Sequence, residues 1–186
     1  MLCPMFAVVL VVGLGPLLVG AFPLDAPKKT CRLSQYGYPA SSELMAVGKF
    51  KEYFESIMPP TDRKCSTRLF HRKWKPNELS VPDRLLLAEA ELDLTVTVLA
   101  HPTIHRLAEM SQQPLAFLTQ ALEDLRGCVA TEAPSHHPSG KLRHWLQKLE
   151  TAKKTETANC LEFSTILNLF HVLNDLRCAA IPEQCT

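Results

Sequence analysis

Apolar side chains recur along this chain every three to four residues, and no stretch shows the sustained alternation of a β-strand. The first helical stretch begins at Ser41 and Ser42, which are good capping residues, and ends near Met58, before two prolines. Its apolar residues fall on one helix face, and they are Ala46, Val47, Phe50, Tyr53, Phe54 and Ile57. The pattern predicts an amphipathic helix here and an all-α protein overall.

Three further helices follow from the same period. Ser80 followed by Pro82 predicts the start of a helix. One face of this helix carries apolar core residues, and three acidic residues lie mostly on the outside. The next helix ends near Cys128, and Pro114 predicts a kink or a break within it. Residues 133–140 predict an exposed linker before another amphipathic helix. The core residues of these helices are Leu85, Leu92, Val96 and Leu99, then Leu107, Met110, Leu118, Leu122 and Leu125, then Leu142, Trp145, Leu146 and Leu149, and the three acids are Glu89, Glu91 and Asp93.

The last predicted helix, residues 156–179, has an apolar arc wider than a core stripe requires. Its core residues are Ile166, Leu169, Leu173 and Leu176, and an extra strip of Phe163, Leu167 and Phe170 lies beside polar Asn168, His171 and Asp175. Two explanations fit this strip. The helix is packed on several sides, or the strip binds a partner molecule.

Residues 59–81 form a long connection with prolines near both ends. A connection of this length is usually functional or crosses the fold, and we expect Cys65 to anchor it. Its basic residues are Arg63, Lys64, Arg68, Arg72, Lys73 and Lys75.

The N-terminal 24 residues carry no charged side chain, and their apolar stretch is broken by Gly13, Gly15 and Pro16. Small residues around Ala21 predict a secretory signal peptide over 1–21, leaving one domain over 22–186 that is secreted. An uncleaved anchor is the alternative, which the short apolar stretch disfavours.

Composition supports one globular domain, since 46% of the 186 residues are hydrophobic and 21% are charged. A net charge of +1 provides no overall field for nucleic acid or an anionic membrane. Six of the seven cysteines follow the signal peptide, which predicts three disulfides with 15 possible pairings. No Cys-x-x-Cys pair is present to begin a zinc site.

The sequence offers little for catalysis or metal binding. His101, His105 and Glu109 have helical spacing, but Pro102 interrupts them, so we expect no metal and no cofactor. Disulfide formation would consume the thiols that a cysteine nucleophile needs. His136 and His137 lie in the predicted linker and are expected to be solvated. These features favour a binding protein over an enzyme.

Several segments together resemble the type III interferons, or interferon lambda. They are CSTRLF at 65–70 with Trp74, LAEAELDLT at 87–95, RHWL at 143–146, CLE at 160–162 and NLF at 168–170. The resemblance extends in order over residues 31–185 and includes the cysteine spacing. It implies an up-up-down-down helical-bundle cytokine of the interleukin-10 class with a long first crossover loop. It also implies the pairs Cys31 with Cys128, Cys65 with Cys160, and Cys178 with Cys185.

The resemblance further implies two receptor partners, an interferon-lambda receptor chain and the interleukin-10 receptor beta chain, whose bridging starts antiviral JAK-STAT signalling. Residues 103–118 match the region of the second receptor contact. The matching first-receptor positions, together with Phe163 from the extra strip, are Lys49, Lys51, Glu55, Arg63, Phe163, Leu167, Phe170 and His171.

Two alternatives remain at this point. The basic loop at residues 63–75 is also suited to weak contact with a sulfated glycosaminoglycan or another polyanion. A different helical cytokine with other receptors has the same sequence pattern.

Overall fold

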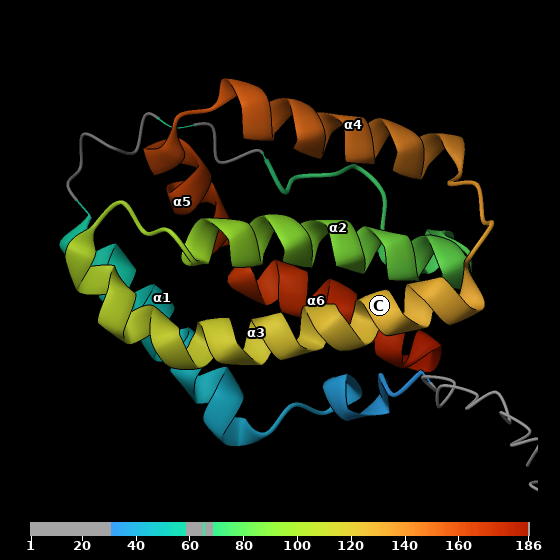
Figure 1. Cartoon of the computed structure of the whole chain (residues 1–186), viewed down its shortest axis with the longest axis horizontal. Coiled ribbons are helices and arrows are strands. Elements are labelled where there is room, and N and C mark those ends of the chain that lie inside the picture. The colour runs from blue at the N-terminus through green and yellow to red at the C-terminus, as the bar shows by residue number, and fades with distance from the viewer. Residues whose placement is uncertain (1–30, 59–64, 66–68, 186) are drawn as a thin grey trace, which may run out of the picture.

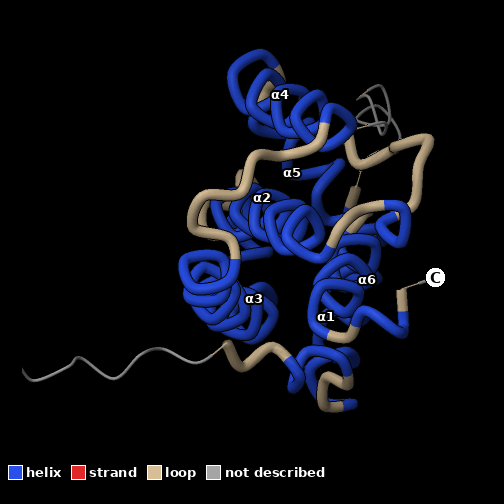
Figure 2. The backbone as a smooth tube through the Cα atoms, turned by 90° about the vertical axis from the view of Figure 1, so that its right-hand side faces the viewer, coloured by secondary structure: helices blue, strands red, loops and turns tan. Residues whose placement is uncertain are grey.

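The computed structural model describes residues 31–58, 65 and 69–185, and these residues form helices joined by loops (Figures 1 and 2). The α-helices are α1 (Ser41–Ile57), α2 (Val81–Leu99), α3 (His105–Glu132), α4 (Gly140–Thr155), α5 (Ala158–Leu167) and α6 (Leu169–Ala180). Short 3-10 helices cover Ser34–Gly37, Pro76–Glu78 and Pro182–Gln184. The all-α prediction is confirmed.

Four of the helices form the bundle itself. In Figure 1, α1 and α2 both run towards the left, whereas α3 and α6 run towards the right, which is the up-up-down-down order. A crossover loop, residues 58–80, leads from the end of α1 to the start of α2 at the other end of the bundle. Helix α4 lies on the opposite side of the molecule from α1 in both views.

Helix α2 is the centre of the molecule and packs against α3, α4, α5 and α6. Its start is as predicted, because the Ser80 hydroxyl accepts a hydrogen bond from the Asp83 backbone N–H and Pro82 occupies the first turn. Leu85, Leu92 and Leu99 of the predicted stripe are buried. A helix with neighbours on so many sides needs an apolar surface nearly all round.

One local prediction needs correction, and at Pro114 the structure selects the kink over the break. Helix α1 is capped by the backbone at Ala40, so Ser41 and Ser42 lie inside its first turn and do not cap it. Helix α3 is not broken at Pro114 but continues through it, and Figure 1 shows α3 bending within its N-terminal half. A proline inside a helix removes one hydrogen bond and crowds the preceding turn, which bends the helix without ending it.

The predicted last helix is two helices, because Asn168 separates α5 from α6. The Asn168 backbone N–H donates to the Thr165 carbonyl, and its side-chain amide donates to the Ser164 carbonyl at 2.7 Å. Its own carbonyl accepts the N–H groups of His171 and Val172, which begins α6. Asn side chains compete in this way with regular helical hydrogen bonds.

The described residues form three disulfides, two of which join segments that are distant in the sequence. Cys31 pairs with Cys128 across 97 residues, Cys65 with Cys160 across 95, and Cys178 with Cys185 across 7. These are the pairs that the resemblance implied. The predicted signal peptide lies outside the described residues. None of the helices within the described residues is long and apolar enough to cross a membrane.

Candidate functional site

Phe170 is an exposed aromatic residue on the first turn of α6, with 46% of its surface accessible. Its ring lies against α1 at Gly48, where an added Cβ would be 3.8 Å from Phe170 Cζ. One edge of the ring therefore packs on α1 while the remainder faces solvent. A large apolar side chain left half in water is the feature to expect at a binding surface.

Residues of α1 continue this surface. Lys51 and Glu55 lie about one and two turns after Gly48, and their side chains form a 2.7 Å ion pair. Lys49 is exposed, but it lies on the adjoining flank of the helix. Arg63 lies outside the described residues. We call the surface formed by Gly48, Lys51, Glu55 and Phe170 the α1/α6 face.

Phe163 does not belong to this face, and its predicted place in an exposed strip is wrong. It is buried with 6% accessible surface, and its ring centroid lies 6.2 Å from that of Phe54. Leu167 is half-buried. The cause is the break at Asn168, because a single straight helix would align Phe163 with Phe170, whereas two helices do not. Packing on several sides explains Phe163, and exposure to a partner remains open only for Phe170.

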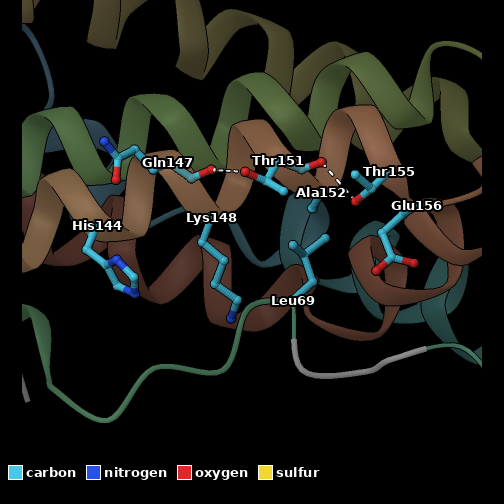
Figure 3. A pocket seen from close by; sticks show the side chains of 8 residues that line it. All are labelled: Leu69, His144, Gln147, Lys148, Thr151, Ala152, Thr155 and Glu156. Carbon is cyan, nitrogen blue, oxygen red and sulfur yellow. Dashed lines mark hydrogen bonds between the residues drawn. The ribbon is translucent and has the colours of Figure 1, made fainter.

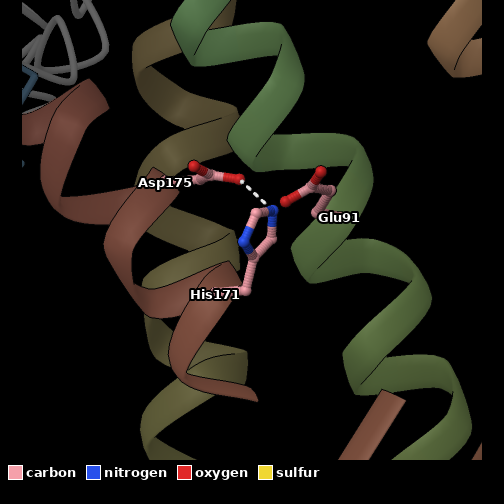
Figure 4. A group of neighbouring side chains, drawn as sticks. All are labelled: Glu91, His171 and Asp175. Atoms are coloured by element: carbon pink, nitrogen blue, oxygen red, sulfur yellow. Dashed lines mark ion pairs between the residues drawn. The ribbon is translucent and has the colours of Figure 1, made fainter. Parts of the chain in front are cut away.

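His171 points towards two acidic side chains, Glu91 and Asp175 (Figure 4). Its Nε2 atom lies 3.4 Å from the Asp175 carboxylate, and 37% of its side chain is exposed. Burial lowers the pKa of the imidazole, while the negative charge of Asp175 opposes that shift. His171 therefore lies at the boundary between the protein interior and the surface.

The acidic side chains beside His171 belong to a buried ionic cluster centred on Arg72 of the crossover loop. The Arg72 guanidinium lies 2.7 Å from Glu91 of α2 and 2.5 Å from Asp175 of α6, and no side chain of the three exceeds 3% exposure. The expectation that Glu91 lies on the outside of its helix is wrong, and Arg72, one of the basic residues of the loop, is buried as well. The sequence did contain a signal for Glu91, because it lies one turn from buried Ala88 on the inner face of α2.

Two tryptophans complete the anchoring of the loop. The Trp145 indole N–H of α4 donates to Glu91 at 3.0 Å, and the Arg72 guanidinium lies over Trp74 and Trp145 at 5.1 and 5.7 Å. Cation–π contacts of this kind are strongest when they are shielded from water. The cluster thus joins the crossover loop to α2, α4 and α6, and it fixes the loop beside the middle of α6.

The cluster holds two carboxylates for one guanidinium. Burial raises the pKa of Glu91 well above its ordinary value, the nearby Asp175 charge raises it further, and Arg72 opposes both effects. Glu91, His171 and Asp175 are also the described residues spaced closely enough to share a metal ion. The Arg72 guanidinium already pairs with both carboxylates, so the cluster is an ion-pair network. His101, His105 and Glu109 form no such group among the described residues.

His136 is part of another polar contact, and the prediction that it is solvated is wrong. Its Nε2 atom lies 2.8 Å from buried Asp83, which also accepts the Ser139 backbone N–H at 3.3 Å. Burial alone would raise the pKa of Asp83, but the hydrogen bonds from Ser139 and His136 lower it on balance. The connection between α3 and α4 is thereby held against the start of α2, and its neighbour His137 is exposed.

The fold and this surface define the class of protein. The bundle is linked by disulfides, its first two helices are parallel, its long crossover loop is anchored, and an exposed aromatic residue lies where α1 and α6 meet. This is the architecture of a helical cytokine.

Comparison with known proteins gives the family. The profile of the Interleukin-28A family matches residues 28–182. The chain is 68% identical to interferon lambda-3 of Gallus gallus over 186 residues, all of both chains. It is 36% identical to interferon lambda-2 of Mus musculus over 166 residues, 88% of this chain and 85% of the mouse protein. It is 33% identical to interferon lambda-1 of Homo sapiens over 183 residues, 96% and 90% of the two chains. The chain belongs to the interferon lambda family, whose members are cytokines and not enzymes.

Proposed function

We propose that this interferon-type cytokine is secreted and joins two class II cytokine receptor chains, the interferon-lambda receptor chain and the interleukin-10 receptor beta chain. Their association would bring receptor-bound kinases together and start antiviral JAK-STAT signalling. The protein contributes binding energy and geometry and performs no chemistry. The observation that carries this proposal is the exposure of Phe170 on the α1/α6 face.

The α1/α6 face has the composition of a protein-binding surface. An exposed aromatic ring supplies the apolar centre, and the paired charges of Lys51 and Glu55 lie next to it as a polar margin. The buried Arg72 cluster fixes the crossover loop to α6 at Asp175, in the middle of the helix that carries Phe170. A surface that is already ordered loses less conformational entropy when a receptor docks.

The second receptor contact is assigned to the first part of α3. Within residues 103–118, Met110 is the large apolar side chain that is exposed, with 41% accessible surface. Helix α3 packs against α1 there, so this region is also rigid. We assign Met110 to the receptor chain that Phe170 does not bind.

The test uses two matched truncations, Phe170→Ala and Met110→Ala, with Tyr38→Ala as a control. Tyr38 is another exposed aromatic residue, at 72% accessible surface, and lies outside both regions. Binding to each purified receptor ectodomain is measured separately. Phe170→Ala should weaken binding to the interferon-lambda receptor chain by about 2 kcal/mol or more, the size expected of a hot spot, and leave the beta chain unaffected.

Met110→Ala should show the opposite selectivity, and Tyr38→Ala should change neither affinity. Circular dichroism checks that helix content is unchanged in all three variants. Equal loss of both receptors with Phe170→Ala, or no loss of either, would contradict the assignment. A reporter response that persists in cells lacking the interferon-lambda receptor chain would instead favour a helical cytokine with different receptors.

A further inference from the structure

The outer surface of α4 has a strong excess of positive charge. The helix contains five basic residues, Lys141, Arg143, Lys148, Lys153 and Lys154, and Glu150 as its one acidic residue. Lys141 and Lys153 are neutralised by Glu78 at 2.7 Å and Asp93 at 2.9 Å. Arg143 and Lys154 are exposed and form no ion pair with a described residue. Since the whole chain carries a net charge of only +1, this excess is local.

A groove of about 440 Å³ lies between α4 and the crossover loop (Figure 3). His144 and Lys148 extend from α4 towards the loop, Leu69 lies on the loop side, and Thr151 contributes a hydroxyl. The Lys148 ammonium donates to the His71 carbonyl at 3.2 Å, which holds the loop alongside the helix. The groove is therefore lined by polar residues of α4, by Glu156 directly after α4 and by Leu69 of the loop, and the Lys148 hydrogen bond fixes the spacing of helix and loop.

The loop adds further cations to this region. His71, Lys73 and Lys75 are exposed. Arg72, which lies between them in the sequence, points inward and forms ion pairs with Glu91 and Asp175. The basic surface therefore differs from the one that the loop sequence suggests. It consists of exposed loop cations together with Arg143 and Lys154 of α4.

We propose that the groove and the adjoining outer surface of α4 bind a sulfated glycosaminoglycan chain. The exposed cations lie on the two elements that border the groove, α4 and the crossover loop, and their charge fits an extended polyanion. Hydroxyl and amide groups of the lining can bond to sugar hydroxyls, and Glu156 is its one carboxylate. Among the described residues, the lining includes no exposed phenylalanine, tyrosine or tryptophan ring on which nucleic-acid bases could stack, and the nearby Trp145 is buried beneath Arg72 and Lys148. The α1/α6 face lies on the other side of the molecule, so both ligands can bind together.

The experiment measures the affinity of the disulfide-bonded protein for size-defined heparin oligosaccharides at several salt concentrations. Two double variants are compared. One removes two cations of α4, Arg143→Gln with Lys154→Gln, and the other removes two cations of the crossover loop, Lys73→Gln with Lys75→Gln. Each double variant should reduce the slope of log affinity against log salt by about two, because each lost contact releases about one counterion fewer. Both should elute from a heparin column at lower salt than the unmodified protein.

The matched control is Arg32→Gln with Arg106→Gln, which removes the same charge from exposed residues outside the groove. An equal loss in this control would show that only overall charge matters, and would overturn the proposal. So would equally tight binding of single-stranded DNA with the same dependence on Arg143 and Lys154. Binding of the groove variants to the two receptor ectodomains should be unchanged, which separates failure of this site from failure of the receptor assignment.

Discussion

The two sides of α6 differ sharply although they belong to one short helix. Towards the interior, Asp175 has 1% accessible surface and holds Arg72 of the crossover loop. Towards the exterior, Phe170 has 46% accessible surface and touches little besides α1. The usual arrangement of charge outside and apolar side chain inside is reversed at both positions.

The reversal separates stability from binding. A buried carboxylate is tolerated only while its partner stays in place, so Asp175 and Arg72 depend on each other. An exposed phenylalanine contributes less to folding, but it has apolar surface to bury against another protein. We therefore expect changes on the inner side to affect unfolding and changes on the outer side to affect affinity.

The largest expected effect comes from removing the covalent frame on which both sides depend. Replacing Cys31 and Cys128 with serine opens a loop of 97 residues, which should lower the free energy of unfolding by about 4.7 kcal/mol. The same chain-entropy relation gives about 2.5 kcal/mol for the loop of 7 residues between Cys178 and Cys185. Urea unfolding of both double variants measures the difference, and equal losses would contradict the entropic explanation.

Arg72→Met should be the most damaging single change on the inner side. It leaves Glu91 and Asp175 buried without their cation, and breaking a buried ion pair in this way costs about 3–5 kcal/mol. Lys73→Met is the matched control, because the neighbouring side chain is exposed and should change stability by about 0.5 kcal/mol or less. Thermal melts that fall equally for the two variants would show that the cluster does not stabilise the fold.

The inner side also predicts a pH dependence. Because the pKa of Glu91 is raised in the folded state, its contribution to stability is complete below the ordinary value of 4.5. That contribution is lost as the pH rises through the raised value, by at most about 1.4 kcal/mol per pH unit for one proton. In Glu91→Gln this decline should disappear from the curve of unfolding free energy against pH.

His171 should act in the opposite direction, because its pKa is lowered in the folded state. Its contribution to stability is complete above the ordinary value of 6.5 and is lost as the pH falls from there through the lowered value. His171→Gln is therefore the control that separates the two groups. If Glu91→Gln leaves the decline above 4.5 unchanged, another group is responsible for it.

The smallest expected effect lies on the outer side. Gly48→Ala should stabilise α1 by about 0.5–1 kcal/mol, because glycine is unfavourable within a helix and this one has no positive φ angle. The added methyl group would meet Phe170 Cζ at 3.8 Å, an ordinary contact distance. Thermal unfolding should therefore show a small rise in melting temperature, and an unchanged or lowered melting temperature would contradict this packing of Gly48 against Phe170.

Much of the secondary structure could be predicted from the sequence because it depends on near neighbours. The period of apolar residues predicted α1, α2, α3 and α4, and Ser80 with Pro82 marked the start of α2. The proline pair at 59–60 correctly ended the first helix. The disulfide pairs, in contrast, came from the family resemblance, since six cysteines alone leave every pairing open.

The tertiary structure alone decided which polar residues are buried and which apolar residues are exposed. Arg72 and Asp175 are 103 residues apart, so no local pattern indicates that they neutralise each other in the interior. In the same way, Phe163 and Phe170 look equivalent on a helical wheel, and only the hydrogen bonds of Asn168 and the position of α1 bury one and expose the other. Helical periodicity depends on hydrogen bonds between residues four apart, whereas the burial of a charge or a ring depends on which distant segment packs against it.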